Sequence, residues 1–243
     1  MRVLIATAFL ALFACVPTYA NIVYANDFDG GVQTGPGTTV SISGGTGIGQ
    51  GIMGGITSTQ GYNAFSDFGG DFWRVTAGND VLQFSLSNVP TSSPVDVSFS
   101  LAMIDSWDGN SSQFGTDIIN VAVLDGTNFV AGFSDVYGNG TVPSSGVESI
   151  IVQDQQLGFN NAPEFHNEDG FRISFDNLTL TSGNLTLRFF ASSGGTGPGF
   201  QGGDDESFAI DNLLVTSTPE PGSLAYLLLA AAGTTARRRR RRD

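Results

Sequence analysis

Carboxylates gather near both ends of the central part of the chain. Asp27 and Asp29 stand near its start, and Asp205 and Asp211 stand near its end, with Asp205 inside the acidic run 204–206. Ca²⁺ takes roughly six to eight oxygen ligands from carboxylates, carbonyls and water. If the first and last strands of the fold are neighbours, these side chains converge. We therefore expect a structural Ca²⁺ site formed by Asp27, Asp29, Asp205 and Asp211.

A second group of acidic residues surrounds a turn. Asp105, Asp108 and Asn110 follow an alternating apolar stretch, and Asp117 begins the next one. Two acids and an asparagine in one turn could bind a second calcium ion. Asp108 is followed by glycine, however, and Asp-Gly is an ordinary turn sequence. The sequence favours the plain turn and leaves the second ion as the alternative.

Aromatic residues and further acids raise the question of sugar chemistry. Trp107 and Tyr137 are candidates for stacking on sugar rings, although Trp107 could equally cap an apolar core. A polysaccharide hydrolase needs two carboxylates opposed across the sugar. The arrangement Glu-x-Asp-x-x-Glu, which β-sandwich glucanases carry, is absent. The single histidine, His166, cannot form an ordinary zinc site without further histidine or cysteine ligands. We therefore expect a non-catalytic protein and keep a secreted hydrolase as the alternative.

The charge of the chain excludes several other functions. All ten basic residues are arginines, and the segment 21–218 holds only three of them against 21 of the 23 acids. A field of this sign repels nucleic acid and attracts cations. The motif G-x-G-x-x-G at Gly49–Gly54 is followed by a sequence that is not helical, so it does not predict a dinucleotide site.

The elements that must position these residues are strands. Apolar residues alternate with polar ones with period two, and no sustained helical period is present. Glycine, asparagine and aspartate punctuate the pattern at short intervals. This predicts an all-β domain over 21–218, an antiparallel β-sandwich or jelly roll of about a dozen strands. The alternating stretches are 22–28, 38–43, 72–76, 81–86, 95–101, 118–124, 129–133, 147–152, 171–175, 185–189 and 208–216.

The N-terminal segment 1–20 has the features of a secretory signal peptide. Arg2 precedes a fourteen-residue apolar stretch, and small residues lead to Ala20, after which signal peptidase would cut. The apolar stretch is shorter than the roughly 20 residues that span a membrane. Removing it also removes Cys15, so we expect an exported mature chain without thiols or disulfides.

The C-terminal segment 219–243 combines three features in a fixed order. Pro219-Glu220-Pro221 comes first, a short apolar helix over 222–236 follows, and six arginines end the chain before Asp243. This order resembles the PEP-CTERM protein-sorting signal of Gram-negative bacteria. The resemblance implies a precursor held transiently in the inner membrane by this helix. It also implies cleavage near Pro219, Glu220 and Pro221 by an exosortase-type enzyme, in organisms that make exopolysaccharide.

The ends of the β-domain resemble jelly-roll carbohydrate-binding modules. In those modules a structural calcium is held by two strands. The N-terminal strand reads Asn-x-x-Phe-Glu-x-Gly, and the C-terminal strand reads Ile-Asp-(Asp/Asn)-Val/Leu. Asp29 takes the position of the glutamate and Asp211 that of the aspartate. The resemblance implies a calcium-stabilised sandwich with glycan binding, in the cell envelope or extracellular matrix. A surface adhesin or structural protein without a ligand pocket remains open.

The sorting interpretation predicts the mass of the secreted protein. Where an exosortase is present, we expect the mature chain to begin at Asn21 and to lack everything after the region of Pro219–Pro221. Intact-mass spectrometry of the secreted form measures both ends. An intact run Arg237–Arg242 in the secreted protein would show that this segment is not a processing signal.

Overall fold

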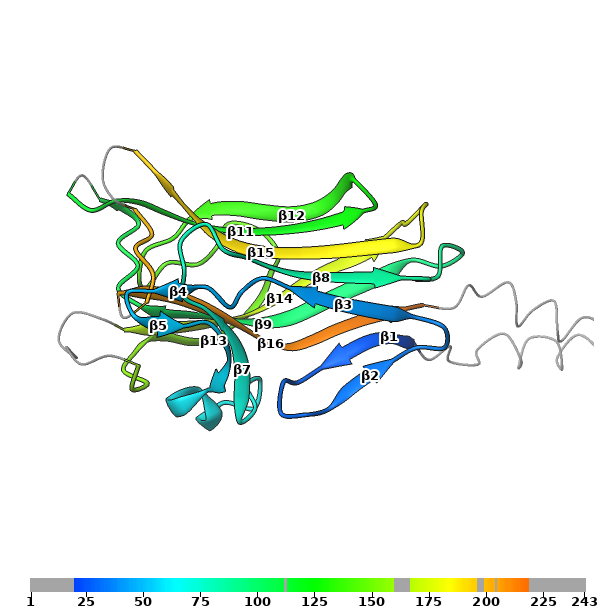
Figure 1. Cartoon of the computed structure of the whole chain (residues 1–243), viewed down its shortest axis with the longest axis horizontal. Helices are drawn as coiled ribbons and strands as arrows, with labels where there is room; N and C mark the ends of the chain where they lie inside the picture. The colour runs from blue at the N-terminus through cyan, green and yellow to red at the C-terminus, as the bar shows by residue number, and fades with distance from the viewer. Residues whose placement is uncertain (1–19, 112, 160–166, 196–198, 204, 219–243) are drawn as a thin grey trace, which may run out of the picture.

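The chain folds into two antiparallel sheets packed face to face. The computed structural model describes residues 20–111, 113–159, 167–195, 199–203 and 205–218, and Figure 1 shows the two layers. The predicted signal helix, the Pro219–Pro221 motif and the apolar C-terminal segment lie outside these residues. Within them no helix is long and apolar enough to span a membrane.

The strands follow the predicted alternation closely. Their bounds are β1 Asn21–Asn26, β2 Val32–Thr34, β3 Thr39–Ser43, β4 Ile48–Gly49, β5 Ile52–Met53, β6 Gly55–Ser58, β7 Asp71–Val75, β8 Val81–Ser87, β9 Val95–Asp105, β10 Asn110–Ser111, β11 Gly115–Asp125, β12 Asn128–Val136, β13 Val147–Gln155, β14 Glu168–Leu178, β15 Asn184–Gly194 and β16 Glu206–Ser217. The described part of the chain has one helical segment, the 3₁₀ turn Gln60–Ala64. The prediction of an all-β sandwich is confirmed.

The larger sheet has the order β13-β14-β9-β16-β1-β2, and β7 with its partner β6 joins it beside β16. The smaller sheet has the order β10-β11-β15-β8-β3, and β12 pairs with β11. The glycine-rich stretch between β3 and β6 contains the short β4–β5 hairpin. The first and last strands, β1 and β16, are neighbours, as the calcium hypothesis requires.

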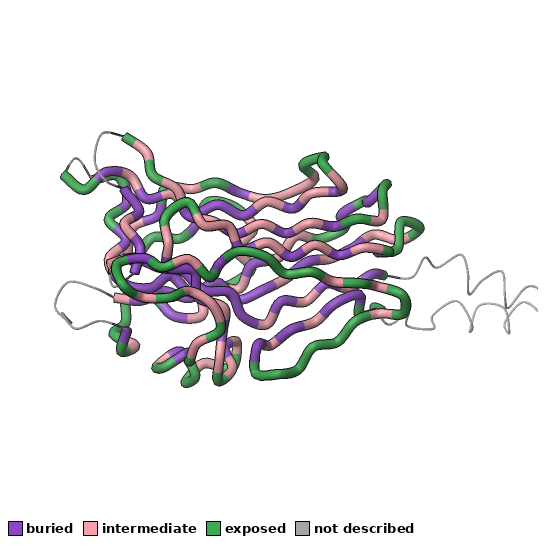
Figure 2. The backbone as a smooth tube through the Cα atoms, viewed as in Figure 1, coloured by how far each residue is buried: buried purple, intermediate pink, exposed green. Residues whose placement is uncertain are grey.

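Aromatic side chains fill the space between the sheets. Phe99 of the larger sheet meets Phe189 of the smaller one edge to face at 5.0 Å, and Phe84 meets Phe189 at 6.1 Å. All three rings are buried, and Figure 2 shows the buried positions alternating along the strands. Each such ring removes an area of 150–250 Å² or so from water. This apolar layer holds the sandwich together without a disulfide.

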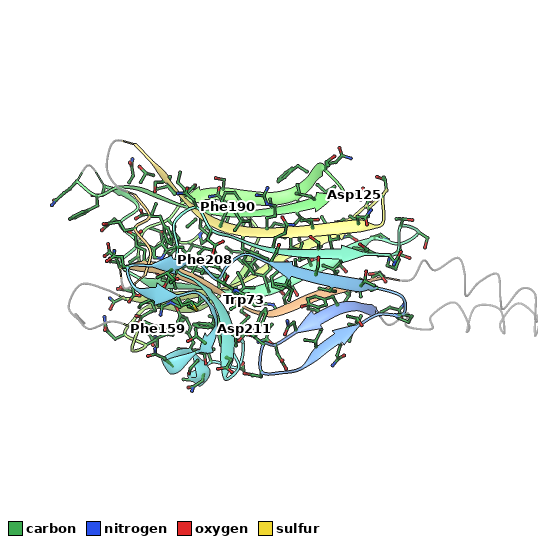
Figure 3. The ribbon with its side chains drawn as sticks, viewed as in Figure 1. Trp73, Asp125, Phe159, Phe190, Phe208 and Asp211 are labelled. Carbon is green, nitrogen blue, oxygen red and sulfur yellow. The ribbon has the colours of Figure 1, made fainter. Side chains whose placement is uncertain are left out.

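Asp125 ties two turns together at one end of the smaller sheet (Figure 3). It ends β11, and its carboxylate accepts hydrogen bonds from the backbone N–H and the hydroxyl of both Thr181 and Ser182. These donors hold the pKa of Asp125 well below its usual range. The carboxylate is therefore charged in the fold under all ordinary conditions.

Replacing Asp125 by asparagine leaves backbone donors without an acceptor. We expect Asp125→Asn to lower the free energy of unfolding by about 1–3 kcal/mol at neutral pH. Because the folded pKa is depressed, this stabilisation is present above the unfolded value near 3.8 and is lost as the pH falls below it. Urea unfolding at several pH values measures both effects. Asp176→Asn, at an exposed position, serves as the control and should change neither; an equal loss in both variants would contradict the assignment.

Candidate functional site

Three carboxylates meet at the end of the sandwich where β16 begins. One oxygen from each of Asp108, Asp117 and Glu206 lies within 4.8 Å of the other two. We call these three residues the acidic cluster. Among the described residues it is the one group of three or more possible metal ligands with this spacing.

Three separate segments bring the acidic cluster together. Glu206 is the first residue of β16 and pairs in register with Asp105, the last residue of β9. Asp108 lies in the loop that follows β9, where it forms an isolated bridge with Gly138. Asp117 is on β11, and its carboxylate accepts a hydrogen bond of 2.7 Å from the backbone N–H of Asp108. Backbone pairing therefore fixes all three positions.

Burial and mutual repulsion shape the electrostatics of the acidic cluster. Burial is the main cause that raises the pKa of Glu206 to about 9, and the charges of Asp117, Asp205 and Asp108 contribute to this shift. Burial is also the main cause that raises the pKa of Asp117 to about 6. Glu206 Oε2 accepts a hydrogen bond from the Gln201 backbone N–H at 2.5 Å. Glu206 Oε1 is buried and has no hydrogen-bond partner among the described residues.

The arrangement suits a small cation better than a sugar. Glu206 and Asp117 are 0% and 1% exposed, and only Asp108 reaches the surface. Glycoside hydrolysis requires both carboxyl groups to contact the substrate, which this burial prevents at the acidic cluster. Asp108 lines a surface depression of about 500 Å³ together with Asn110 and Asn139. Of the acidic cluster, Asp108 is the residue that lines this depression.

The predicted Ca²⁺ ligands are divided between two places. Asp211 Oδ2 accepts the N–H of Gly69 at 2.7 Å, while Asp29 Oδ2 and Oδ1 accept those of Gly70 at 2.9 Å and Asp71 at 2.6 Å. The first and last strands thus bring Asp29 and Asp211 to consecutive backbone amides. Burial raises the pKa of Asp211 to about 6, and Asp29 and Asp27 contribute.

The other two predicted Ca²⁺ ligands, Asp27 and Asp205, lie in different places. Asp27 Oδ1 accepts the backbone N–H of Gly31 at 3.0 Å, close to Asp29. Asp205 lies six residues before Asp211, a distance of roughly 20 Å along an extended strand. Its side chain accepts the hydroxyl of Ser106 at 2.9 Å. Asp205 therefore belongs to the surroundings of the acidic cluster and does not join Asp27, Asp29 and Asp211.

Trp107 and Tyr137 are core residues, which corrects their interpretation as sugar-stacking aromatics. Their rings are 2% and 1% exposed and meet edge to face at 5.5 Å. The indole N–H of Trp107 donates to the Ser207 carbonyl at 2.9 Å, and the Tyr137 hydroxyl donates to Asp169. Both polar groups are used inside the fold, so neither ring presents a free face to a ligand.

Sequence reasoning missed the role of Glu206, although it noted the acidic run that contains it. Successive side chains of a strand point to opposite faces. Asp205 and Glu206 are neighbours, so one of them faces the interior and the other does not. The apolar residues Phe208 and Ile210, both buried, share the phase of Glu206. This alternation was the available signal for choosing Glu206 over Asp205.

A groove of about 840 Å³ crosses the outer face of the larger sheet. Its lining comes from β13, β14, β9, β16, β1 and β2 and is mostly polar: Ala25, Asn26, Asp27, Gly31, Gln33, Ser66, Asp67, Asp96, Ser98, Glu148, Ser149, Arg172, Ser174, Asp176, Asn212, Leu213 and Leu214. Five carboxylates face one cation, Arg172, which donates to Ser98 Oγ at 2.8 Å and lies 3.9 Å from Glu148. The groove is therefore hydrophilic and negatively charged.

Comparison with known proteins gives solved structures of low similarity and no sequence family. No protein-family model and no curated protein sequence matches it. A xylan-binding CBM22 domain of Xyn10C from Paenibacillus barcinonensis is similar over 84% of this chain and 98% of that domain, with 14% identity and a TM-score of 0.31. The catalytic domain of Agl-KA is similar over 84% of this chain and 30% of its own length, with 14% identity and a TM-score of 0.38.

A third similar structure is the enzymatically active domain of tailspike protein 4 from bacteriophage CBA120. It matches 75% of this chain, with 13% identity and a TM-score of 0.32. The chain spans 19% of that domain's length. Carbohydrate-binding modules and catalytic domains thus both occur among the similar structures.

The raised pKa of Glu206 predicts how the metal-free protein responds to pH. A carboxyl whose folded pKa lies above its unfolded value favours the fold when protonated. The contribution of Glu206 to stability is therefore full below its unfolded pKa of 4.5 and is lost as the pH rises toward about 9. We expect Glu206→Gln to flatten this fall and to gain a few kcal/mol relative to wild type between pH 5 and pH 9.

Urea unfolding in the presence of EDTA at pH 5, 7 and 9 measures this difference. Asp176→Asn, an exposed substitution, is the control and should follow the wild-type curve. Parallel pH profiles for wild type and Glu206→Gln would show that Glu206 carries no unfavourable charge in the fold.

Proposed function

We propose that this protein is an exported, non-catalytic component of the cell envelope or extracellular matrix that binds a neutral glycan in the groove of its larger sheet. The observation that carries the proposal is the groove itself, a polar channel that crosses six neighbouring strands. With strands spaced about 4.8 Å apart, these strands span roughly 24 Å. A channel of that length suits an extended polymer better than a single small molecule.

The chemistry of the lining supports a polyhydroxyl ligand. Sugar hydroxyls donate hydrogen bonds to carboxylates such as Asp96 and Asp176, and they accept them from Arg172 and Asn212. Ser98 and Ser174 can do either, and both are partly exposed on the groove floor. The excess of carboxylates repels anionic polymers, so the lining favours neutral glycans.

The affinity should be modest. The described lining contains no aromatic side chain, so hydrogen bonds must supply most of the binding energy. Each contributes a small net free energy, because the sugar and the groove exchange bonds with water. We expect dissociation constants in the micromolar to millimolar range, about −8 to −4 kcal/mol.

The two terminal segments support the location of this activity. The signal-peptide features of residues 1–20 support export, with signal peptidase as the first partner. The resemblance of Pro219–Arg242 to an exosortase-sorted tail supports a membrane-held precursor and release into the envelope or matrix. In that setting the glycan is an exopolysaccharide of the matrix.

Blocking the groove tests the proposal. An array of neutral and acidic glycans identifies the ligand, and calorimetry then compares Ser174→Trp with wild type. We expect Ser174→Trp to weaken binding at least tenfold, because an indole on the groove floor occupies the space of the sugar. The melting temperature should change little.

The matched control is Ser85→Trp, the same substitution at a partly exposed position on β8 of the smaller sheet. It should retain wild-type affinity. An array without any signal, or equal binding by Ser174→Trp and wild type, would refute the groove as a glycan site. It would favour a surface protein without a ligand pocket.

A further inference from the structure

Glu206 differs from the other buried acids in how its charge is compensated. Asp105 is paired with Arg74 at 3.1 Å. Asp125, Asp169 and Asp211 each accept two or more hydrogen bonds. Among the described residues, Glu206 accepts one hydrogen bond, its Oε1 is buried without a partner, and it lies with Asp108 and Asp117 within 4.8 Å.

Glu168 is the other buried glutamate with an oxygen that lacks a hydrogen-bond partner among the described residues. Its surroundings are different: burial raises its pKa, but backbone hydrogen bonds and the positive charge of Arg74 act in the opposite direction. The main charges acting on Glu206 are those of Asp117, Asp205 and Asp108, all of the same sign as its own. A buried carboxylate among other carboxylates is unfavourable in its charged form unless a cation balances the charge.

We propose that Asp108, Asp117 and Glu206 bind a divalent cation of the hard, oxygen-preferring class, with Ca²⁺ as the fitting ion. The three ligands are carboxylates without sulfur or imidazole, which suits Ca²⁺ and Mg²⁺ and does not suit zinc or copper. Two oxygens on opposite sides of Ca²⁺ lie up to roughly 4.6–5.2 Å apart, against about 4.2 Å for Mg²⁺. Carboxylate oxygens that all lie within 4.8 Å of one another fit inside the coordination sphere of Ca²⁺.

The depression beside the acidic cluster gives the ion access from solvent and room for water ligands. Asp108 is exposed there, so the ion has a path from solvent. Water in the depression can complete the coordination shell, since water is among the roughly six to eight oxygen ligands that Ca²⁺ takes. The site is separate from the groove, whose lining includes none of the three residues.

Bound at this position, the ion joins elements that are distant in the sequence. Glu206 belongs to the larger sheet, Asp117 to the smaller sheet, and Asp108 to the loop after β9. The ion therefore links the two layers of the sandwich at one end. Because it requires the folded arrangement, its binding stabilises the fold by linkage.

Calcium titration of the full chain, stripped of metal with EDTA, tests the proposal. We expect the melting temperature to rise by roughly 5 to 10 °C when free Ca²⁺ reaches 100 times its dissociation constant. Tb³⁺, which takes the same oxygen ligands, should luminesce when tryptophan is excited, because Trp107 directly precedes Asp108. Added Ca²⁺ should reduce that signal.

Substitutions locate the ion. Glu206→Gln and Asp117→Asn should abolish both responses, and Asp108→Asn, at an exposed position and so tolerated by the fold, should weaken Ca²⁺ binding at least tenfold. Asp211→Asn is the matched control, because Asp211 is a buried acid of the same strand with its oxygens hydrogen-bonded. It should lower the melting temperature but keep the full Ca²⁺ response, as should Asp29→Asn.

Two results would overturn the proposal. One is a wild-type protein whose melting temperature and Tb³⁺ luminescence do not respond to Ca²⁺. The other is a Ca²⁺ response that persists in Asp108→Asn at full affinity or disappears in Asp29→Asn. The second result would place the ion at the junction of the first and last strands instead. Glycan binding is measured independently, so its failure leaves this test unaffected.

Discussion

This fold depends on hydrogen bonds that backbone amides donate to carboxylates, which take the place of ion pairs. The segment 21–218 has 21 acids and three arginines, so most buried carboxylates cannot form ion pairs. Asp211 accepts the N–H of Gly69 in a loop, and Asp169 accepts those of Gly140 in a loop and of Asp154 near the end of β13. Hydrogen bonds of this kind hold the pKa of Asp125 well below its usual range, whereas at Asp211 they only oppose burial, which raises the pKa to about 6. The acids therefore fasten the loops to the sheets, a role that disulfides fill in many exported domains.

The strand β16 shows how this constraint organises the larger sheet. Along one side β16 pairs with β9, and along the other it pairs first with β7 and then with β1. The change of partner falls at Asp211 and Asn212, where the register of β16 with β9 shifts and Asn212 has a φ of 48°. Asp211 and Asp29 close the resulting gap by binding Gly69, Gly70 and Asp71. These hydrogen bonds to carboxylates connect the two neighbouring strands at the point where β16 changes its partner.

Much of the fold could be predicted because period-two alternation is a local signal. Each of the eleven predicted strands is present, and the neighbouring of β1 and β16 followed from the expected sandwich. The side chains of Trp107 and Tyr137 were harder to place. Both lie beyond alternating stretches, in loops whose burial depends on how the two sheets close over them. Local pattern carries no information on that closure.

The acidic cluster and the groove depend on non-local register in the same way. Glu206 meets Asp117 only because the two sheets pack with one particular offset, and Asp108 joins them through its bridge to Gly138. The groove arises from six strands that meet out of sequence order. Sequence pattern could therefore identify the acids and their strands, but the grouping of acids required the sheet order.

The two proposed sites share β16 yet have separate physical bases. Glu206 begins that strand, and Asn212, which lines the groove, follows six residues later, roughly 20 Å away along an extended backbone. Between them, Phe208 and Ile210 are fully buried in the core, where close packing opposes a second arrangement. Coupling between distant sites needs an element with two states that both sites bias. A rigid central strand is not such an element, so the ion should stabilise the fold without changing the affinity of the groove.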